Sequence, residues 1–290
     1  MRAETLAQLR CPACRGTLAL EGSAARQAAV TEGSLRCPCG QVYPITDGIP
    51  DLVFPRDQPF HDEDAQTYDT LISFIARLLK ADEQATRSHV VDLLELEPGA
   101  RVLEIACGPA SNLPLLLDRV GPTGEVVALD ISADMVRLAR DKLGAGAERV
   151  ELMLANGVHL PFADHVFDAV LHIGTLNRFP DIPMALAEMA RVVKVGGKVV
   201  AGDEGLGPWL NGSDYARILN KFGGLFEGAP PLDALPTAIE EVRLHWLMGH
   251  AYFAIELRTT ADPPELDLDV QLPGRSVTVR DVLEAQKPRS

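Results

Sequence analysis

Between residues 100 and 203, short apolar runs alternate with segments of helical periodicity. The runs are RVLEIA, EVVALD, VELMLA, FDAVLH and GKVVAGD, and the segments between them include SNLPLLLDRV, ADMVRLARDKL and IPMALAEMARVVK. Strands that alternate with helices form a parallel sheet that is covered on both faces. The fold class is therefore predicted to be α/β, with a mostly parallel sheet.

The flanking segments extend this sheet domain. Two stretches at helical spacing, TYDTLISFIARLLK and QATRSHVVDLLEL, precede the first strand. Later, EEVRLHWLMGHAYFAIELRT contains two β-rich runs that meet at Met248, Gly249 and His250. This pattern predicts a hairpin, so the last strand is expected to be antiparallel. In the acidic, proline-containing tail from residue 261, the stretch SVTV is predicted to form one short strand.

The charge distribution argues against a nucleic-acid partner. The formal net charge is −14, and the first 60 residues hold 6 Arg, no Lys and 6 acidic residues, so the excess lies in the later part. Binding to a phosphate backbone needs clusters of Lys and Arg, and the sequence contains no dense cluster. Nucleic acid is therefore a disfavoured partner.

Two further features concern membranes. No apolar run approaches the roughly 18 residues that a membrane span needs. The first residues, MRAETLAQLRCPAC, lack the apolar segment of a secretory signal. We therefore expect a cytoplasmic protein with no membrane partner.

Four of the five cysteines are crowded between residues 11 and 39. Cys11 and Cys14 form a C-x-x-C pair, and Cys37 and Cys39 form a C-x-C pair. Without a secretory signal, such thiols are more typical of a metal site than of disulfides. Four thiolates suffice for a closed, tetrahedral, structural zinc site. The alternatives are an iron–sulfur cluster and four reduced, buried thiols.

The loop LEIACGPASN follows the first strand of the alternation. An enzyme that binds a dinucleotide needs glycines spaced G-x-G-x-x-G here, so that backbone N–H groups approach a pyrophosphate. This loop has only Gly108, and Ala106 and Ala110 place side chains where glycines are needed. A ligand that contains an adenosine and an amino acid but no phosphate suits the loop better.

The loop resembles motif I of class I S-adenosylmethionine-dependent methyltransferases, which has the form acid-x-Gly-x-Gly-x-Gly. Glu104 matches the acid, and Ala106, Gly108 and Ala110 match the three small positions. EVVALDIS, ADMVRLAR, ANGVHLPFADHVFDAVLHIG and RVVKVGGKVVAGD resemble later segments of the family, so the resemblance covers about residues 62 to 205. It implies a Rossmann-like sheet of seven strands and S-adenosyl-L-methionine as cofactor.

The resemblance also implies which residues contact this cofactor. Asp130, 22 residues beyond Gly108, would accept hydrogen bonds from both ribose hydroxyls. Met135 would cover the adenine, and Asn156 and Gly157 would contact it. The predicted set is Tyr68, Glu104, Ala106, Gly108, Asp130, Ile131, Met135, Asn156, Gly157 and His172.

Several of these residues also have simpler interpretations. Asp130 could instead cap the helix that follows it. Met135 could be an ordinary core residue, Asn156 and Gly157 could form only a turn, and Tyr68 could serve only in helix packing.

GQVYPITDGIP, residues 40 to 50, resembles the end of a zinc ribbon. This ribbon is known from the small activator subunit of tRNA and protein methyltransferases, and it is fused ahead of some methyltransferase domains. The resemblance implies a structural Zn²⁺ bound by Cys11, Cys14, Cys37 and Cys39. We expect a zinc-ribbon-like module over 1–58, an S-adenosylmethionine-binding domain over 59–260 and a C-terminal extension over 261–290.

The methyl acceptor should bind beside the ends of the fourth and fifth strands. His172, Asn177, Arg178, Asp203 and Glu204 are within reach of that position. His172 is predicted to be the catalytic base, because the unperturbed pKa of histidine lies near neutrality. A histidine at a strand end can also be structural. Residues 210–226 and the later hairpin are expected to supply a lid.

The leading hypothesis is a methyltransferase that acts on a small, fairly apolar metabolite. One alternative is a ribosomal RNA guanine methyltransferase, since such enzymes can also combine a zinc ribbon with this fold. The other is a non-catalytic binding module, which the two alanines of the motif would suit. Neither the acceptor nor the oligomeric state follows from the sequence.

Overall fold

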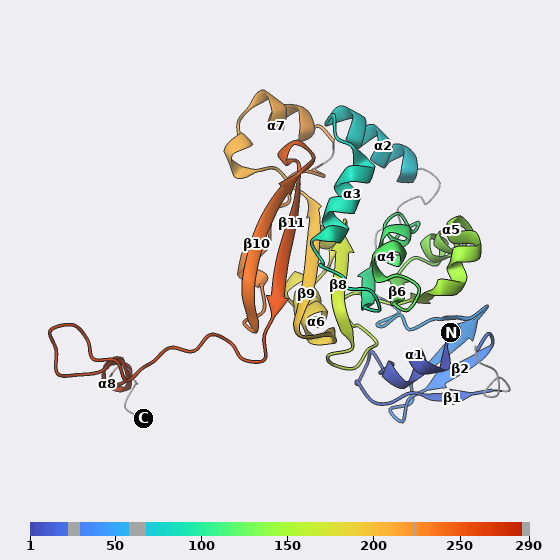
Figure 1. Cartoon of the computed structure of the whole chain (residues 1–290), viewed down its shortest axis with the longest axis horizontal. Helices are drawn as coiled ribbons and strands as arrows, with labels where there is room; N and C mark the ends of the chain where they lie inside the picture. Colours follow the sequence, from blue (N-terminus) through green and yellow to red (C-terminus); the bar gives the residue numbers. More distant parts are fainter. Residues whose placement is uncertain (23–29, 58–67, 223, 286–290) are drawn as a thin grey trace.

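The computed structural model describes residues 1–22, 30–57, 68–222 and 224–285. These residues form a sheet of seven strands, in the order β10-β11-β9-β8-β5-β6-β7, and a smaller sheet of four (Figure 1). The strands of the larger sheet are β5 (Arg101–Ile105), β6 (Glu125–Asp130), β7 (Val150–Leu154), β8 (Phe167–Ile173), β9 (Val193–Glu204), β10 (Ile239–Leu247) and β11 (Tyr252–Thr259).

The strand directions match the sequence prediction. β5 pairs in parallel with β6 and β8, β6 with β7, and β8 with β9. Among the described strands of this sheet, β11 alone runs opposite to the others, because it pairs antiparallel with both β9 and β10. The seven-stranded, mostly parallel sheet with an antiparallel last strand is therefore confirmed, and so is the hairpin.

Both faces of the larger sheet are buried. Leu103 and Ile105 belong to one apolar cluster, which includes α6 (Ile182–Val192). Val102, the residue before Leu103, points to the opposite face and belongs to a second cluster with α3 (Glu83–Asp92), α4 (Leu113–Val120) and α5 (Ala133–Leu143). This burial of alternate residues on both faces explains why the strands are continuous apolar runs.

The smaller sheet shares the core of the larger one. Its antiparallel strands are β1 (Ala19–Glu21), β2 (Gly33–Arg36), β3 (Val42–Thr46) and β4 (Ile49–Pro50), and α1 (Ala3–Gln8) precedes them. Leu35, Tyr43 and Ile45 lie in the same apolar cluster as Leu103. The N-terminal module therefore packs against the sheet domain as one of its covering layers.

Polar contacts fix the module in this position. Leu52 N donates to Leu154 O over 2.8 Å, beside an isolated parallel bridge between Asp51 and Leu154. On α6, Glu188 accepts a hydrogen bond from Arg15 Nη2 over 2.7 Å. The division of the chain at residues 58 and 260 remains a prediction.

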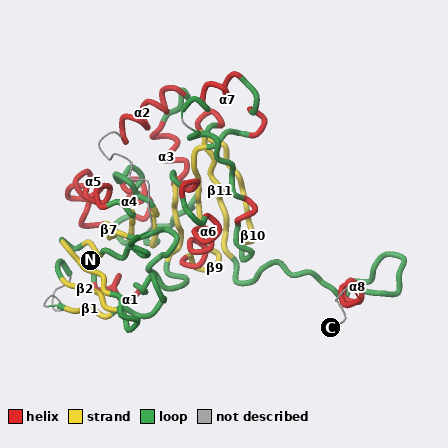
Figure 2. The backbone as a smooth tube through the Cα atoms, turned by 180° about the vertical axis from the view of Figure 1, so that it is seen from behind, coloured by secondary structure: helices red, strands yellow, loops and turns green. Residues whose placement is uncertain are grey.

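Helices α2 (Tyr68–Leu78) and α7 (Asp214–Leu219) lie side by side at one end of the larger sheet (Figures 1 and 2). They share a third apolar cluster, to which Ile75 and Leu219 belong. The predicted helices before the first strand are confirmed as α2 and α3. Within the expected lid, α7 covers only residues 214–219.

The chain after β11 extends away from the body and ends in α8 (Val279–Ala285) (Figure 1). The predicted strand at SVTV is wrong, because Val279 already begins this helix. Thr278 N donates to Asp281 Oδ2 over 2.7 Å, and Asp281 N donates to Thr278 Oγ1 over 3.1 Å. This reciprocal arrangement is a capping box, which starts a helix. None of the helices described is both long and apolar enough to cross a membrane.

Candidate functional site

The loop after β5 keeps the backbone shape of a glycine-rich loop although it contains alanines. Ala106, Gly108 and Ala110 have φ angles of 53°, 50° and 69°. For a residue other than glycine, this left-handed backbone conformation costs about 1–2 kcal/mol of conformational energy. A Cβ on Gly108 would meet no atom within 4 Å, so there is open space beside this residue.

Asp130, at the end of β6, connects this loop to the start of α5. Its Oδ2 accepts a hydrogen bond from Gly108 N over 2.9 Å, and its Oδ1 accepts one from Ser132 N over 2.9 Å. Ser132 is itself the helix cap and accepts a hydrogen bond from Met135 N. The Asp130 carboxylate thus orders the entry to α5 and also lines the cavity described next.

A cavity of about 330 Å³ lies beyond the C-terminal ends of β5, β6 and β8. Open α/β sheets bind their ligands at this place. Seven of the predicted cofactor residues line the cavity: Ala106, Gly108, Asp130, Ile131, Met135, Asn156 and Gly157. The structure therefore brings together three loops that the sequence separates.

Asn156 and Gly157 are more constrained than a simple turn requires. Asn156 Oδ1 accepts a hydrogen bond from Val158 N over 3.0 Å, and its Nδ2 donates to Phe54 O over 3.2 Å. A Cβ on Gly157 would lie 2.8 Å from both Ile105 Cγ2 and Phe179 Cζ. Glycine at 157 therefore lets the Phe179 ring pack against the cavity floor.

Glu104 lies beneath the loop and does not line the cavity. Its Oε1 accepts a hydrogen bond from Asn112 Nδ2 over 2.7 Å, whereas its buried Oε2 has no hydrogen-bond partner among the described residues. Burial raises the pKa of Glu104 to about 8, against the opposing effect of the Asn112 hydrogen bond. Glu104 is thus a buried acid with one unsatisfied oxygen below the cavity.

Two other predicted contacts have different outcomes. Met135 is 5% exposed and lines the cavity, so core packing and ligand contact are compatible for it. Tyr68 is the first residue of α2, and its side chain lies outside the described part of the structure.

His172, the predicted base, is completely buried and does not line the cavity. Its Nδ1 lies 3.0 Å from Ile105 O, and its ring stacks on Phe179 with 4.9 Å between the ring centroids. Burial lowers the pKa of His172, so the neutral ring with a proton on Nδ1 fits this position. The geometry favours support of Phe179, which does line the cavity, over direct contact with a reactant.

Asp203 and Glu204, at the end of β9, differ in their surroundings. Asp203 is 2% exposed and accepts backbone hydrogen bonds from Thr175 N, Asn177 N and Glu204 N. Glu204 lines the cavity together with Arg178. Burial, with a smaller effect from Asp203, raises the pKa of Glu204 well above its usual range. Glu204 is therefore the carboxyl group of this pair that can exchange a proton with a ligand.

An aliphatic wall completes the cavity and was not predicted from the sequence. Leu71, Ile72 and Ile75 of α2 form it together with Leu225. The only signal in the sequence was that apolar residues occupy more than one side of this helix.

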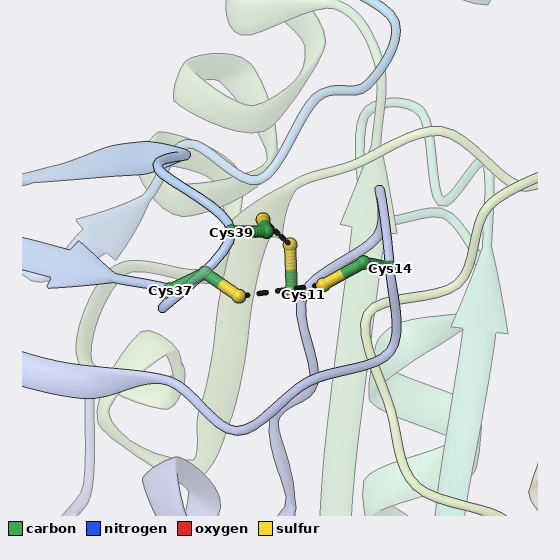
Figure 3. A group of neighbouring side chains, drawn as sticks. All are labelled: Cys11, Cys14, Cys37 and Cys39. Atoms are coloured by element: carbon green, nitrogen blue, oxygen red, sulfur yellow. Dashed lines mark hydrogen bonds between the residues drawn. The ribbon is translucent and has the colours of Figure 1, made fainter.

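The four cysteines of the N-terminal module lie together (Figure 3). All four Sγ atoms are within 4.8 Å of one another, with 3.4 Å between Cys14 and Cys37 and 3.7 Å between Cys11 and Cys39. Zn–S bonds of about 2.3 Å in a tetrahedron place sulfur atoms about 3.8 Å apart. The C-x-C spacing therefore does not prevent four ligands from converging, and Tyr43 Oη lies 3.2 Å from Cys11 Sγ as an additional hydrogen-bond partner.

The ubiE/COQ5 methyltransferase family matches residues 59–203, which is half of the chain. The chain belongs to this family. A second family, described as Trm112p-like protein, matches residues 2–48. The predicted combination of a class I methyltransferase with an N-terminal zinc-ribbon module is thus confirmed.

Individual relatives match a shorter region. The demethylmenaquinone methyltransferases of Bacillus cytotoxicus and Bacillus cereus (strain ATCC 10987) are 42% and 38% identical to the chain over 118 residues. This region is 40% of the chain and 50% of each relative. The chain thus spans about half the length of the curated relatives it matches.

Two solved structures show the same fold at low identity. An S-adenosylmethionine-dependent methyltransferase from Aquifex aeolicus is 21% identical with a TM-score of 0.50, over 69% of this chain and 100% of that chain. A chain from the complex of the Haloferax volcanii Trm112 methyltransferase activator with a methyltransferase is 16% identical with a TM-score of 0.54, over 70% and 100% of the two chains.

Proposed function

We propose that this protein is an S-adenosylmethionine-dependent methyltransferase that acts on a small, fairly apolar acceptor. The observation that carries the proposal is the cavity in which the motif loop and Asp130 face an aliphatic wall and Glu204. Family membership supports the reaction type. Demethylmenaquinone, from which the matched Bacillus methyltransferases take their name, is the first candidate acceptor.

The residues present fit the proposed cofactor. Open space beside Gly108 leaves room for it, and Asp130, which lines the cavity, would offer a carboxylate to ribose hydroxyls. Glu104, beneath the loop, has an unsatisfied oxygen that would attract the cofactor's ammonium group. When bound, S-adenosylmethionine supplies a methyl group on a positively charged sulfonium. Methyl transfer then depends mainly on alignment and on the protonation state of the acceptor.

We assign control of the acceptor's protonation state to Glu204. Its ionised carboxylate would accept the proton that the acceptor loses when the new bond to the methyl group forms. The α2 wall of Leu71, Ile72 and Ile75 would exclude water from an apolar acceptor. His172, the base predicted from the sequence, would instead hold Phe179 in place.

The test is transfer of isotopically labelled methyl from S-adenosylmethionine to metabolite extracts and to reduced demethylmenaquinone, followed by mass spectrometry. We expect a small-molecule product. Label recovered only in ribosomal RNA would contradict the proposed substrate class, and cofactor binding without transfer to any acceptor would favour a non-catalytic module.

Replacement of Asp130 by Ala is expected to weaken binding of S-adenosylhomocysteine by about 10- to 100-fold, through loss of charge-assisted hydrogen bonds. Titration calorimetry measures this change. Asp134→Ala is the matched control. This substitution removes the same charge, but from an exposed position at the start of α5 that lies outside the cavity. Equal affinities of the two variants would contradict the assignment of Asp130.

Cofactor affinity should also depend on pH through Glu104. The pKa of this carboxyl group is about 8 in the free protein because of burial, so the group is mostly protonated at pH 6 to 7. A bound ammonium group favours the ionised form, so binding releases a proton. Affinity should therefore rise by about tenfold per pH unit between pH 6 and 7.5. Calorimetry across this range checks the slope, and Glu104→Gln should flatten it; a steep slope in that variant would assign the proton to another group.

We also propose that the cysteine cluster binds one structural Zn²⁺ through Cys11, Cys14, Cys37 and Cys39, at a distance from the reaction. A cytoplasmic location remains a prediction.

A further inference from the structure

Helix α2 has apolar side chains on the side that faces solvent as well as on the side that faces the core. Ile75 and Ala76 are buried, at 6% exposure each, and Leu79 packs in the same cluster as Ile75. Leu71 and Phe74, however, are 44% and 47% exposed. A surface helix of a globular protein normally presents polar residues to solvent, so a second apolar stripe indicates a second contact.

Helix α7 and the turn after it continue this stripe. Ile218 and Phe222 are 54% and 39% exposed. The rings of Phe222 and Phe74 lie 5.7 Å apart between centroids, which joins the two segments into one surface. We call Leu71, Phe74, Leu78, Ile218 and Phe222 the apolar platform.

Exposed basic side chains flank the platform, although the chain as a whole is acidic and exposed acids such as Asp214 also lie near it. Arg77 near the end of α2 and Lys80 just after it flank the platform, as do Arg217 on α7 and Lys221 just after that helix. Arg217 forms an ion pair with Asp214. The formal net charge of the chain is −14. Four basic side chains around an apolar face are typical of segments that lie on an anionic lipid surface.

The platform is continuous with the cavity. Leu71 is both 44% exposed and part of the cavity lining, and its neighbours Ile72 and Ile75 form the adjoining wall. A ligand with an apolar chain could therefore pass from the platform into the cavity along aliphatic surface.

We propose that the apolar platform of α2 and α7 docks the protein on an anionic membrane surface, with the cavity opening toward the lipid. Phe74, Phe222 and Leu71 enter the boundary between headgroups and acyl chains, while Arg77, Lys80 and Lys221 lie at the level of the anionic headgroups. Our expectation of no membrane partner rested on the lack of a spanning segment, and peripheral docking needs none. The docking does not depend on the proposed methyl transfer, although it would give an amphiphilic acceptor a route to the cavity.

Flotation of the whole protein with vesicles tests the proposal. Vesicles of phosphatidylcholine with about 30% phosphatidylglycerol are compared with vesicles of pure phosphatidylcholine. We expect flotation with the anionic vesicles and about tenfold weaker partitioning of Phe74→Ser/Phe222→Ser and of Arg77→Glu/Lys80→Glu. Val242→Ser/Leu244→Ser is the matched control, because these side chains are 45% and 37% exposed on β10 and should partition as the wild type does.

Thermal melting and S-adenosylhomocysteine binding report whether each variant is folded. Absence of wild-type flotation, or equal flotation of the Phe74/Phe222 variant in its folded form, would overturn the proposal. The wild type could instead self-associate in sedimentation experiments without binding vesicles. If the Phe74/Phe222 variant lost that self-association, the platform would be assigned to contact with a second copy of the chain. Vesicle binding without any methyltransferase activity would leave the docking intact and contradict only the proposed function.

Discussion

Replacement of Glu204 by Gln is expected to lower kcat by about 10²–10⁴-fold while S-adenosylhomocysteine affinity stays nearly unchanged. The amide keeps the size of the side chain and cannot accept the proton from the acceptor. The pKa of Glu204 is raised by burial, so the wild-type rate should fall as pH drops through that pKa and the carboxylate becomes protonated. Steady-state kinetics against pH would show this acidic limb, and the variant should lack it.

The fold itself should tolerate this substitution. Burial opposes ionisation of Glu204 in the folded state, so a neutral amide removes no favourable charge at neutral pH, and thermal melting serves as the control. Glu227→Gln is a matched variant, because Glu227 is exposed and does not line the cavity. Full activity with an intact acidic limb in Glu204→Gln would remove Glu204 from the reaction. A lost limb in His172→Gln, with Glu204→Gln normal, would return the role of base to His172.

Replacement of Cys37 by Ser is expected to abolish metal binding and to unfold the N-terminal module. Structural zinc sites contribute on the order of 10–16 kcal/mol in small domains, and removal of one of four thiolates forfeits most of that stabilisation. Because Leu35 and Tyr43 share a core cluster with Leu103, we also expect a lower Tm for the sheet domain. Elemental analysis gives the metal content, and limited proteolysis with differential scanning calorimetry follows the unfolding.

Cys107→Ser is the matched control for this experiment. Cys107 is also buried but lies in the other core cluster, outside the four-cysteine group, so its loss should leave about one zinc per chain. A full metal content in Cys37→Ser would contradict the four-ligand site. Visible absorbance in the wild type would instead reveal an iron–sulfur cluster.

The fold of the sheet domain was predictable because its signals are local. Runs such as VVAL (126–129) and AVL (169–171) are continuously apolar, as is typical of strands buried on both faces. The tail was harder, because SVTV has β-type composition but Thr278 and Asp281 form a capping box that starts a helix. A local side-chain hydrogen bond thus outweighed intrinsic strand preference.

The candidate site was predictable where it follows strand ends and not where it depends on tertiary placement. Asp130 is the last residue of β6 and Asn156 comes two residues after β7, so the two had to meet at one end of the parallel sheet. His172 is also close to a strand end, but it is still inside β8, where its side chain points into a packed layer under Phe179. The aliphatic wall around Ile75 required knowledge of where α2 docks, and no local pattern carries that information.

The contact between residues 51–52 and Leu154 has a consequence for the solubility of the chain. β7 is the last strand on its side of the sheet, and an open strand edge presents unpaired N–H and C=O groups to other molecules. The bridge from Asp51 and the hydrogen bond from Leu52 N cover the end of that edge. The N-terminal module therefore protects this edge strand from pairing with strands of other molecules. A chain shortened to the methyltransferase part would expose the edge of β7 and should aggregate more readily.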